Sequence, residues 1–194
     1  MNHRYTPRMN RFVTSTALAA CCAVVVAGAG APPGPPVIRV PQLERRINDL
    51  INTQRTAARL RPLRVDDRLT RIARAHSEDM ATRGFFDHIN AQGEDPTARG
   101  KHAGYECRKA IDKSTFREGL AENLSDVPRV SRILTMGDRK TYEFNSVEDI
   151  ARLAVEGWMH SPGHRRNILY TTFSESGVGI AVSSKDIYIT QLFC

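Results

Sequence analysis

Residues 158–169 read WMHSPGHRRNIL, and the elements on either side of this stretch decide how the chain folds. Before it, Ser146 and Asp149 have the spacing of a capping box, which predicts that a helix begins there. Apolar residues then recur at helical spacing up to Trp158, so one face of this helix is expected to be buried. Ser161-Pro162-Gly163 should end the helix, because proline lacks an amide hydrogen and clashes with the preceding turn.

The segment that follows predicts two paired strands. Residues 177–183 (GVGIAVS) and 186–193 (DIYITQLF) are short apolar runs separated by a polar turn, which is typical of a β-hairpin. The glycines of Gly177-Val178-Gly179 precede apolar strand residues. We therefore interpret them as packing positions rather than as a phosphate-binding loop.

The segment that precedes the stretch predicts three helices. Residues 41–59 and about 67–83 carry apolar side chains at helical spacing. Asp95 is expected to cap a short helix that begins at Pro96 and ends by Gly104.

Two side chains on these helices, and the segments between the helices and strands, also give expectations. His76 lies on the apolar stripe of its helix and is expected to be a hydrogen-bonded core histidine. Arg55 falls away from the apolar face of the first helix. Residues 105–120 read as irregular or short-stranded, and residues 125–145 show no clear period, so we expect a loop or insertion there.

The N-terminal segment has the pattern of an export signal. Residues 1–11 are polar and basic, and residues 12–31 are small or apolar without a charge. Three fates remain open for residues 1–31, namely cleavage after Ala29, lipidation at Cys21, or retention as a membrane anchor. Each places the rest of the chain outside the cytoplasm, as a domain over residues 41–194 behind a proline-rich linker over residues 32–40.

Charge and cysteine content narrow the class of protein. The net charge of +7 includes three arginines before residue 12, and the remaining excess is spread along the chain without a basic stripe, which argues against a nucleic-acid partner. Membrane contact is expected only through the N-terminal segment. Cys107 and Cys194 are the two cysteines beyond that segment, and in an oxidising compartment they are expected to pair, with two free thiols as the alternative.

Several motifs, taken in order, resemble the bacterial branch of the CAP superfamily (also called SCP; cysteine-rich secretory proteins, antigen 5 and pathogenesis-related 1 proteins). They are AHSEDM to GFFDH over residues 75–88, AENL over 121–124, the stretch 158–169, and the two strand segments that follow it. The resemblance covers about residues 43–193. It implies an α+β fold, a three-layer α/β/α sandwich with a central, mostly antiparallel sheet, in a secreted or envelope-associated bacterial protein.

The resemblance also implies a central cavity with two histidines and two glutamates. His88, Glu122 and His164 match three of these positions, although Ala121 stands where the family usually has glycine. Ser161 occupies the place of the second glutamate in eukaryotic members. Bacterial members often have a glutamate between the Asn-Ile-Leu segment and the Gly-Val-Gly strand instead, and the resemblance therefore makes Glu175 the candidate for that role. His88 and His164 are accordingly the candidate ligands for zinc or another divalent cation.

The function expected from these residues is binding rather than catalysis. The sequence has no Gly-x-Ser-x-Gly elbow, no P-loop and no His-Glu-x-x-His helix, so no catalytic residue is assigned. We expect a monomeric module that binds a hydrophobic small molecule, such as a lipid or sterol, or an envelope protein. The alternatives are a metal-assisted hydrolase or peptidase, and a purely structural envelope protein.

Overall fold

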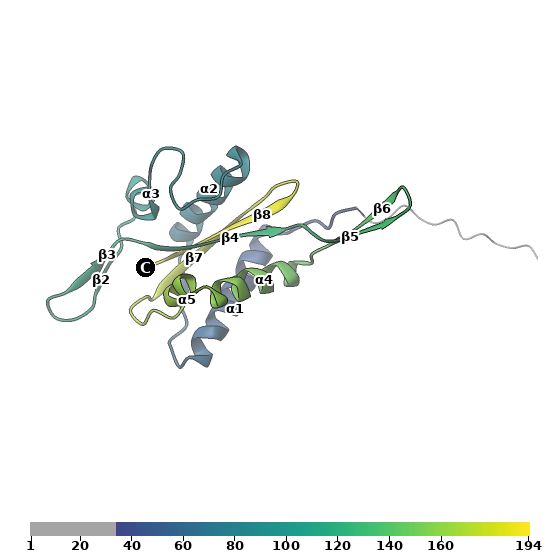
Figure 1. The fold of residues 1–194 in the computed structure, drawn as a ribbon. Helices are drawn as coiled ribbons and strands as arrows, with labels where there is room; N and C mark the ends of the chain where they lie inside the picture. Colours follow the sequence, from purple (N-terminus) through teal and green to yellow (C-terminus); the bar gives the residue numbers. More distant parts are fainter. Residues whose placement is uncertain (1–33) are drawn as a thin grey trace, which may run out of the picture. The chain divides into compact units, whose positions relative to one another are not determined.

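The computed structural model describes residues 34–194 (Figure 1). The expected export segment, residues 1–31, and the first two residues of the linker lie outside the described residues. From residue 34 onward, none of the helices is both long and apolar enough to cross a membrane.

A four-stranded sheet forms the middle layer, in the order β1-β7-β8-β4. Its strands are β1 (Arg64–Val65), β4 (Ala121–Pro128), β7 (Glu175–Val182) and β8 (Asp186–Phe193). The pairs β7–β8 and β4–β8 are antiparallel, whereas the short β1 runs parallel to β7. The mostly antiparallel sheet expected from the sequence is confirmed, together with the hairpin that its last two strands form.

Helices cover both faces of this sheet (Figure 1). Helix α2 (Asp67–Arg83) packs on one face against β7 and β8. Helices α1 (Val40–Ala57) and α4 (Val147–His160) pack on the other face and against each other. The α+β class and the three-layer arrangement are therefore confirmed.

Successive residues of β7 face the two opposite layers of helices in turn. Val178 and Ile180 belong to the buried core that includes residues of α1 and α4. Gly177 and Gly179 point the other way, where a Cβ atom at either position would fall within 2.2 Å of the α2 backbone. The two glycines thus let α2 lie directly on the strand, which confirms their interpretation as packing positions.

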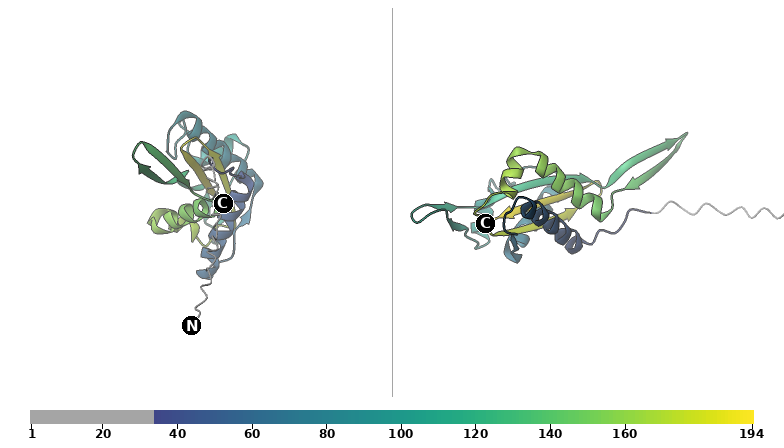
Figure 2. Two further views of the ribbon diagram at one scale, coloured as in Figure 1. Left: turned by 90° about the vertical axis from the view of Figure 1, so that its right-hand side faces the viewer. Right: turned by 90° about the horizontal axis from the view of Figure 1, so that it is seen from below.

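Two shorter helices and two hairpins complete the fold. Helix α3 (Pro96–His102) begins after Asp95, whose carboxylate accepts from the Ala98 amide at 2.7 Å, and helix α5 (Pro162–Ile168) follows the break after α4. The hairpins are β2 (Arg108–Ala110) with β3 (Phe116–Glu118), and β5 (Val130–Met136) with β6 (Arg139–Phe144). Figure 2 shows that they project from opposite ends of the sheet.

The expectation of a loop over residues 125–145 is wrong. β4 continues to Pro128 because it pairs with β8 along its whole length, and residues 130–144 form the second hairpin. Gly137, with a φ of 59°, and Asp138 make its two-residue turn, for which a glycine with positive φ is well suited. Among residues 34–194, no other helix or strand packs closely on this hairpin, and most of its side chains are exposed. The hairpin therefore has no buried apolar face that a sequence pattern could reveal.

Arg55 also departs from expectation, because its side chain is buried with only 1% of the residue exposed. Its guanidinium donates to the carbonyl oxygens of Ile168, Tyr170 and Phe173 at 2.7, 3.0 and 3.3 Å, and to that of Arg61 at 2.8 Å. Burial lowers the pKa of Arg55. The residue thereby fixes α1 to the chain that runs from α5 to β7.

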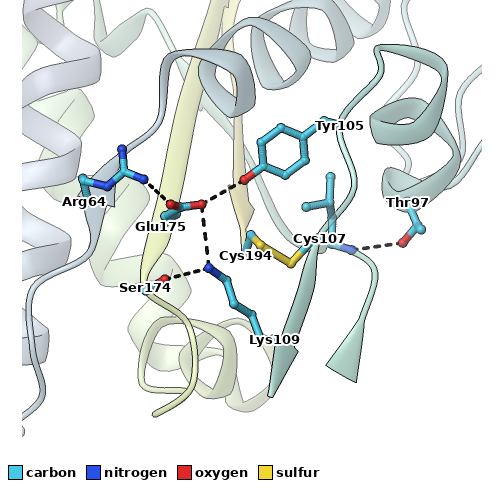
Figure 3. Close-up of a disulfide and its surroundings, with 9 residues drawn as sticks. Arg64, Thr97, Tyr105, Cys107, Lys109, Ser174, Glu175 and Cys194 are labelled. Atoms are coloured by element: carbon cyan, nitrogen blue, oxygen red, sulfur yellow. Dashed lines mark hydrogen bonds and ion pairs between the residues drawn. A yellow bond between two sulfur atoms is a disulfide. The ribbon is translucent and has the colours of Figure 1, made fainter. Parts of the chain in front are cut away.

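The disulfide between Cys107 and Cys194 is present, as expected, with 5.6 Å between the two Cα atoms (Figure 3). It joins the segment before β2 to the residue that follows β8. Both cysteines are buried, and they pack with Leu69, Tyr105 and Leu192 beneath α2.

Candidate functional site

The centre of the candidate site is a buried carboxylate, Glu122. It lies at the start of β4 opposite Leu192 of β8, and its side chain is 1% exposed. One oxygen, Oε1, lies 2.8 Å from His88 Nδ1, and the other accepts a hydrogen bond from the Arg99 guanidinium. Both oxygens of this buried anion therefore have charged or polar partners, as a buried charge requires.

Arg99 connects this carboxylate to the loop that carries His88. It lies on α3 with 7% of its side chain exposed, and its Nη1 donates to the carbonyl oxygens of His88 and Glu94 at 2.7 and 3.0 Å. The His88 backbone and ring are thus fixed by the same two groups. Sequence reasoning missed Arg99, because an arginine on a seven-residue helix gives no signal of burial.

A second set of contacts positions His164 on α5. The Asn123 side chain donates to the His164 carbonyl oxygen at 3.2 Å, and the Asn167 side chain donates to Asn123 Oδ1 at 3.0 Å. Asn167 also donates to the Glu122 carbonyl oxygen at 3.2 Å. These amides connect α5 to β4, which explains why the asparagines accompany Glu122 and His164 in the motifs.

His88 and His164 line one cavity of about 320 Å³, together with Phe86, Asp87 and Leu124. We call it the two-histidine pocket. The His88 side chain is 50% exposed, whereas the carboxylate that holds it is buried. The pocket therefore offers two imidazoles beside an apolar residue from the loop and another from β4.

The two imidazoles differ in their affinity for a proton. The hydrogen bond to Glu122 raises the pKa of His88 above its ordinary value, with a smaller opposing contribution from burial. Burial lowers the pKa of His164, and a positive charge on His88 lowers it further. On acidification, His88 is consequently the first of the two rings to become charged.

Glu175 does not join this pocket, which corrects its assignment as the second cavity glutamate. It lies at the start of β7, where it accepts a hydrogen bond from the Tyr105 hydroxyl at 3.0 Å and pairs with Arg64 and Lys109 (Figure 3). Glu122 and Glu175 are two strands apart, about 10 Å across the sheet, with β8 between them. Glu175 therefore belongs to the surroundings of the disulfide.

The metal expected from the resemblance does not fit the chain's own side chains. Across residues 34–194, no group of three or more histidine, cysteine, aspartate or glutamate side chains is arranged to hold a metal ion. Glu122 is directed at His88 and Arg99, and Asp87 Oδ1 accepts from the Ile89 amide at 2.9 Å, so the pocket supplies two imidazoles and one partly engaged carboxylate. An ordinary zinc site needs four ligands, three of them from protein even when it is catalytic.

Comparison with known proteins identifies a family model and relatives that match most of the chain. The model of the cysteine-rich secretory protein (CAP) family matches residues 49–193. The uncharacterized protein YkwD of Bacillus subtilis is 31% identical over 148 residues, which are 76% of this chain and 46% of that protein. The chain thus spans less than half the length of this relative.

Solved structures with the same fold include two bacterial proteins described as extracellular or outer-surface. An extracellular protein with an SCP domain from Bacillus anthracis is 22% identical, with a TM-score of 0.56 over 82% of this chain and 44% of that one. An outer surface protein from Borrelia burgdorferi is 17% identical, with a TM-score of 0.55 over 78% of this chain and 92% of that one.

Proposed function

Because the chain belongs to the cysteine-rich secretory protein (CAP) family, we propose that it is an extracytoplasmic binding module whose ligand site is the two-histidine pocket. The observation that carries the proposal is the half-exposed His88 side chain. Its ring is hydrogen-bonded to the buried Glu122 carboxylate, which is itself paired with the buried Arg99. Such support holds a ring in one orientation toward a ligand. A residue that served only packing would not need half of its side chain at the surface.

The residues of the pocket favour binding over catalysis. No serine, threonine or cysteine is among the five residues that line it, so the pocket lacks the hydroxyl or thiol nucleophile of the common covalent hydrolases. Phe86 and Leu124 offer apolar surface, and the imidazoles offer polar contacts at defined places. This combination fits an amphipathic molecule or an apolar side chain of an envelope protein, with an oxygen directed at His88.

Placement outside the cytoplasm is supported by two independent features. The Cys107–Cys194 disulfide suits an oxidising compartment, since thiols are kept reduced in the cytosol. The solved structures that share the fold include extracellular and outer-surface bacterial proteins. Together with the export pattern of residues 1–31, these features support secretion or attachment to the envelope.

Native mass spectrometry of the oxidised protein tests the proposal. We expect a non-covalent adduct that disappears on denaturation and is absent from the His88→Ala/His164→Ala variant. His160→Ala is the control, because this histidine is exposed and lies outside the pocket. An adduct that survives in the pocket variant would place the ligand elsewhere.

The same spectra recorded with added zinc test the alternative of a metal-assisted hydrolase. The incomplete set of ligands gives this alternative less support than binding. One zinc ion per chain, lost in the pocket variant but retained in the control variant, would reverse that order. A bare protein in every condition would instead favour a structural role for the site.

A further inference from the structure

A second cavity, separate from the two-histidine pocket, lies between α2 and α3. It has a volume of about 370 Å³, and its lining includes Ile72, Ala75, His76, Asp79, Glu94 and Arg99. A smaller cavity of about 180 Å³ shares Ile72, Ala75 and Ala103 with it and continues along α2 to Arg68 and Arg71. We call the two together the α2–α3 groove.

Helical spacing gives the groove an apolar part and a polar part. Ile72, Ala75, His76 and Asp79 follow one another at intervals of three, one and three residues, which places them on one side of α2. Ile72 and Ala75 supply the apolar part. His76 and Asp79 supply the polar part, opposite Glu94 and Arg99.

Three side chains of the polar part carry buried atoms without a hydrogen-bond partner among residues 34–194. They are His76 Nδ1, Asp79 Oδ2 and Arg99 Nε. His76 is 2% exposed and Arg99 is 8% exposed. An unsatisfied buried polar group costs about 1–3 kcal/mol, so three around one cavity call for a specific explanation.

The other hydrogen bonds of these side chains determine whether each unpaired atom is a donor or an acceptor. His76 Nε2 lies 2.9 Å from the Asp87 carbonyl oxygen and must donate to it, which leaves Nδ1 of the neutral ring as an acceptor. Burial lowers the pKa of His76, in keeping with the neutral ring. Asp79 Oδ1 is engaged by Arg83 at 2.6 Å, and its Oδ2 is a second acceptor.

Arg99 Nε, in contrast, is a hydrogen-bond donor without an acceptor. Two unused acceptors and one unused donor thus lie buried at the polar part of the groove. In the polar part, Asp79 and Glu94 supply two carboxylates beside Arg99, whereas Arg68 and Arg71 lie at the other end of the groove. Glu94 keeps a lowered pKa through its hydrogen bonds with Asn90 and His102, while the charge of Arg99 is matched by Glu122.

A protonated α-amino group next to its own carbonyl has the complementary pattern. The ammonium group has three hydrogens for the acceptors, and the carbonyl oxygen can accept from the arginine. We propose that the α2–α3 groove binds this chemical unit, the amino-terminal end of a peptide or a free amino-acid derivative, with an apolar first side chain against Ile72, Ala75 and Ala103. The three free atoms are shielded from solvent, so the side chains around them must shift before a ligand reaches these atoms.

The probes are Leu-Ala-Ala-amide, its N-acetylated form, and leucinamide, each titrated into the oxidised chain by calorimetry. The proposal expects the free tripeptide to bind at least tenfold more tightly than the acetylated one, because acetylation removes the ammonium group. Leucinamide distinguishes the two sources of the ligand. Equal affinity for leucinamide indicates a free amino-acid derivative, and tighter binding of the tripeptide indicates a peptide terminus.

Two variants locate the binding in the groove. Ala75→Trp fills the apolar part from an exposed position, and Asp79→Asn removes one acceptor charge; each should weaken binding at least tenfold. Glu78→Gln is the matched control, because it removes an exposed charge from the neighbouring position of α2 and should leave affinity within twofold. Unchanged melting temperatures show that the variants remain folded.

The proposal is overturned by equal affinity for the free and acetylated tripeptides, or by unchanged affinity in both groove variants. It is also overturned if none of the three probes binds, in which case water alone satisfies the three atoms. None of these outcomes depends on His88 or His164, so this site and the two-histidine pocket can fail separately.

Discussion

Replacing Gly179 by alanine would place a methyl group against the backbone of helix α2. The added Cβ would lie 1.9 Å from the Arg74 nitrogen and 2.4 Å from the Ala73 carbonyl carbon. Ordinary contact begins at 3.4 Å, so the helix would have to retreat by about 1.5 Å. The atoms in the way belong to a helix backbone, which cannot rotate aside as a side chain does.

The cost follows from the packing that this retreat disturbs. Leu69, Ala73 and Met80 of α2 are completely buried, and each would lose close contact with the sheet. Overpacking a core costs about 1–3 kcal/mol and occasionally more, and we expect the upper end, about 3 kcal/mol, because backbone must move. At roughly 2–4 °C per kcal/mol for a chain of this size, the melting temperature should fall by about 10 °C.

Urea unfolding of the oxidised protein, followed by circular dichroism, measures this cost. Gly157→Ala is the control, because Gly157 lies on the exposed side of α4 with no atom within 4 Å of the added Cβ. That change should leave the protein unchanged or stabilise it by up to about 1 kcal/mol, since alanine favours helix. A cost below about 0.5 kcal/mol for Gly179→Ala would refute direct packing of α2 on β7.

Three further predictions concern bonds and charges. Replacing Cys107 and Cys194 together by alanine should lower the free energy of unfolding by about 4.6 kcal/mol in the chain-entropy model, and urea midpoints should then be insensitive to reducing agent. Replacing Arg55 by leucine should destabilise by about 2–4 kcal/mol, because four carbonyl oxygens lose their donor; a thermal melt would show little change if they found water instead. The raised pKa of His88 means that its contribution to stability is full below its unfolded pKa and is lost as pH rises through its folded pKa. The stability difference between wild type and His88→Gln, measured by urea titration from pH 5 to 9, should therefore shrink with rising pH, and a difference that grows would contradict the assignment.

The elements that sequence predicts well are those with strong local signals. The 3.6-residue period of α1, α2 and α4 reports a buried face directly, and the capping box at Ser146 marks where α4 begins. The glycines of β7 could be assigned to packing because they alternate with core residues on an apolar strand. His76 could be placed in the core for the same reason, from its position on an apolar stripe.

The features that sequence misses depend on contacts between distant segments. Arg55 is buried because carbonyl oxygens more than a hundred residues away surround it, and its position on α1 carries no sign of this. Arg99 becomes part of the site only when α3 meets β4. Glu175 is excluded from the pocket because β8 separates its strand from that of Glu122. His88, Glu122 and His164 were found through a family resemblance, and no local pattern identifies them as neighbours.

Glu122 raises the pKa of His88 and Arg99 fixes the His88 backbone, so His88 is the proton-carrying ring of the two-histidine pocket. The decisive measurement is a titration of the histidine side chains by NMR, in wild type and in Glu122→Gln. We expect a pKa for His88 above that of His164, and a fall in the pKa of His88 when the carboxylate is replaced. A His88 that titrates at or below His164, or that is unaffected by Glu122→Gln, would contradict this assignment.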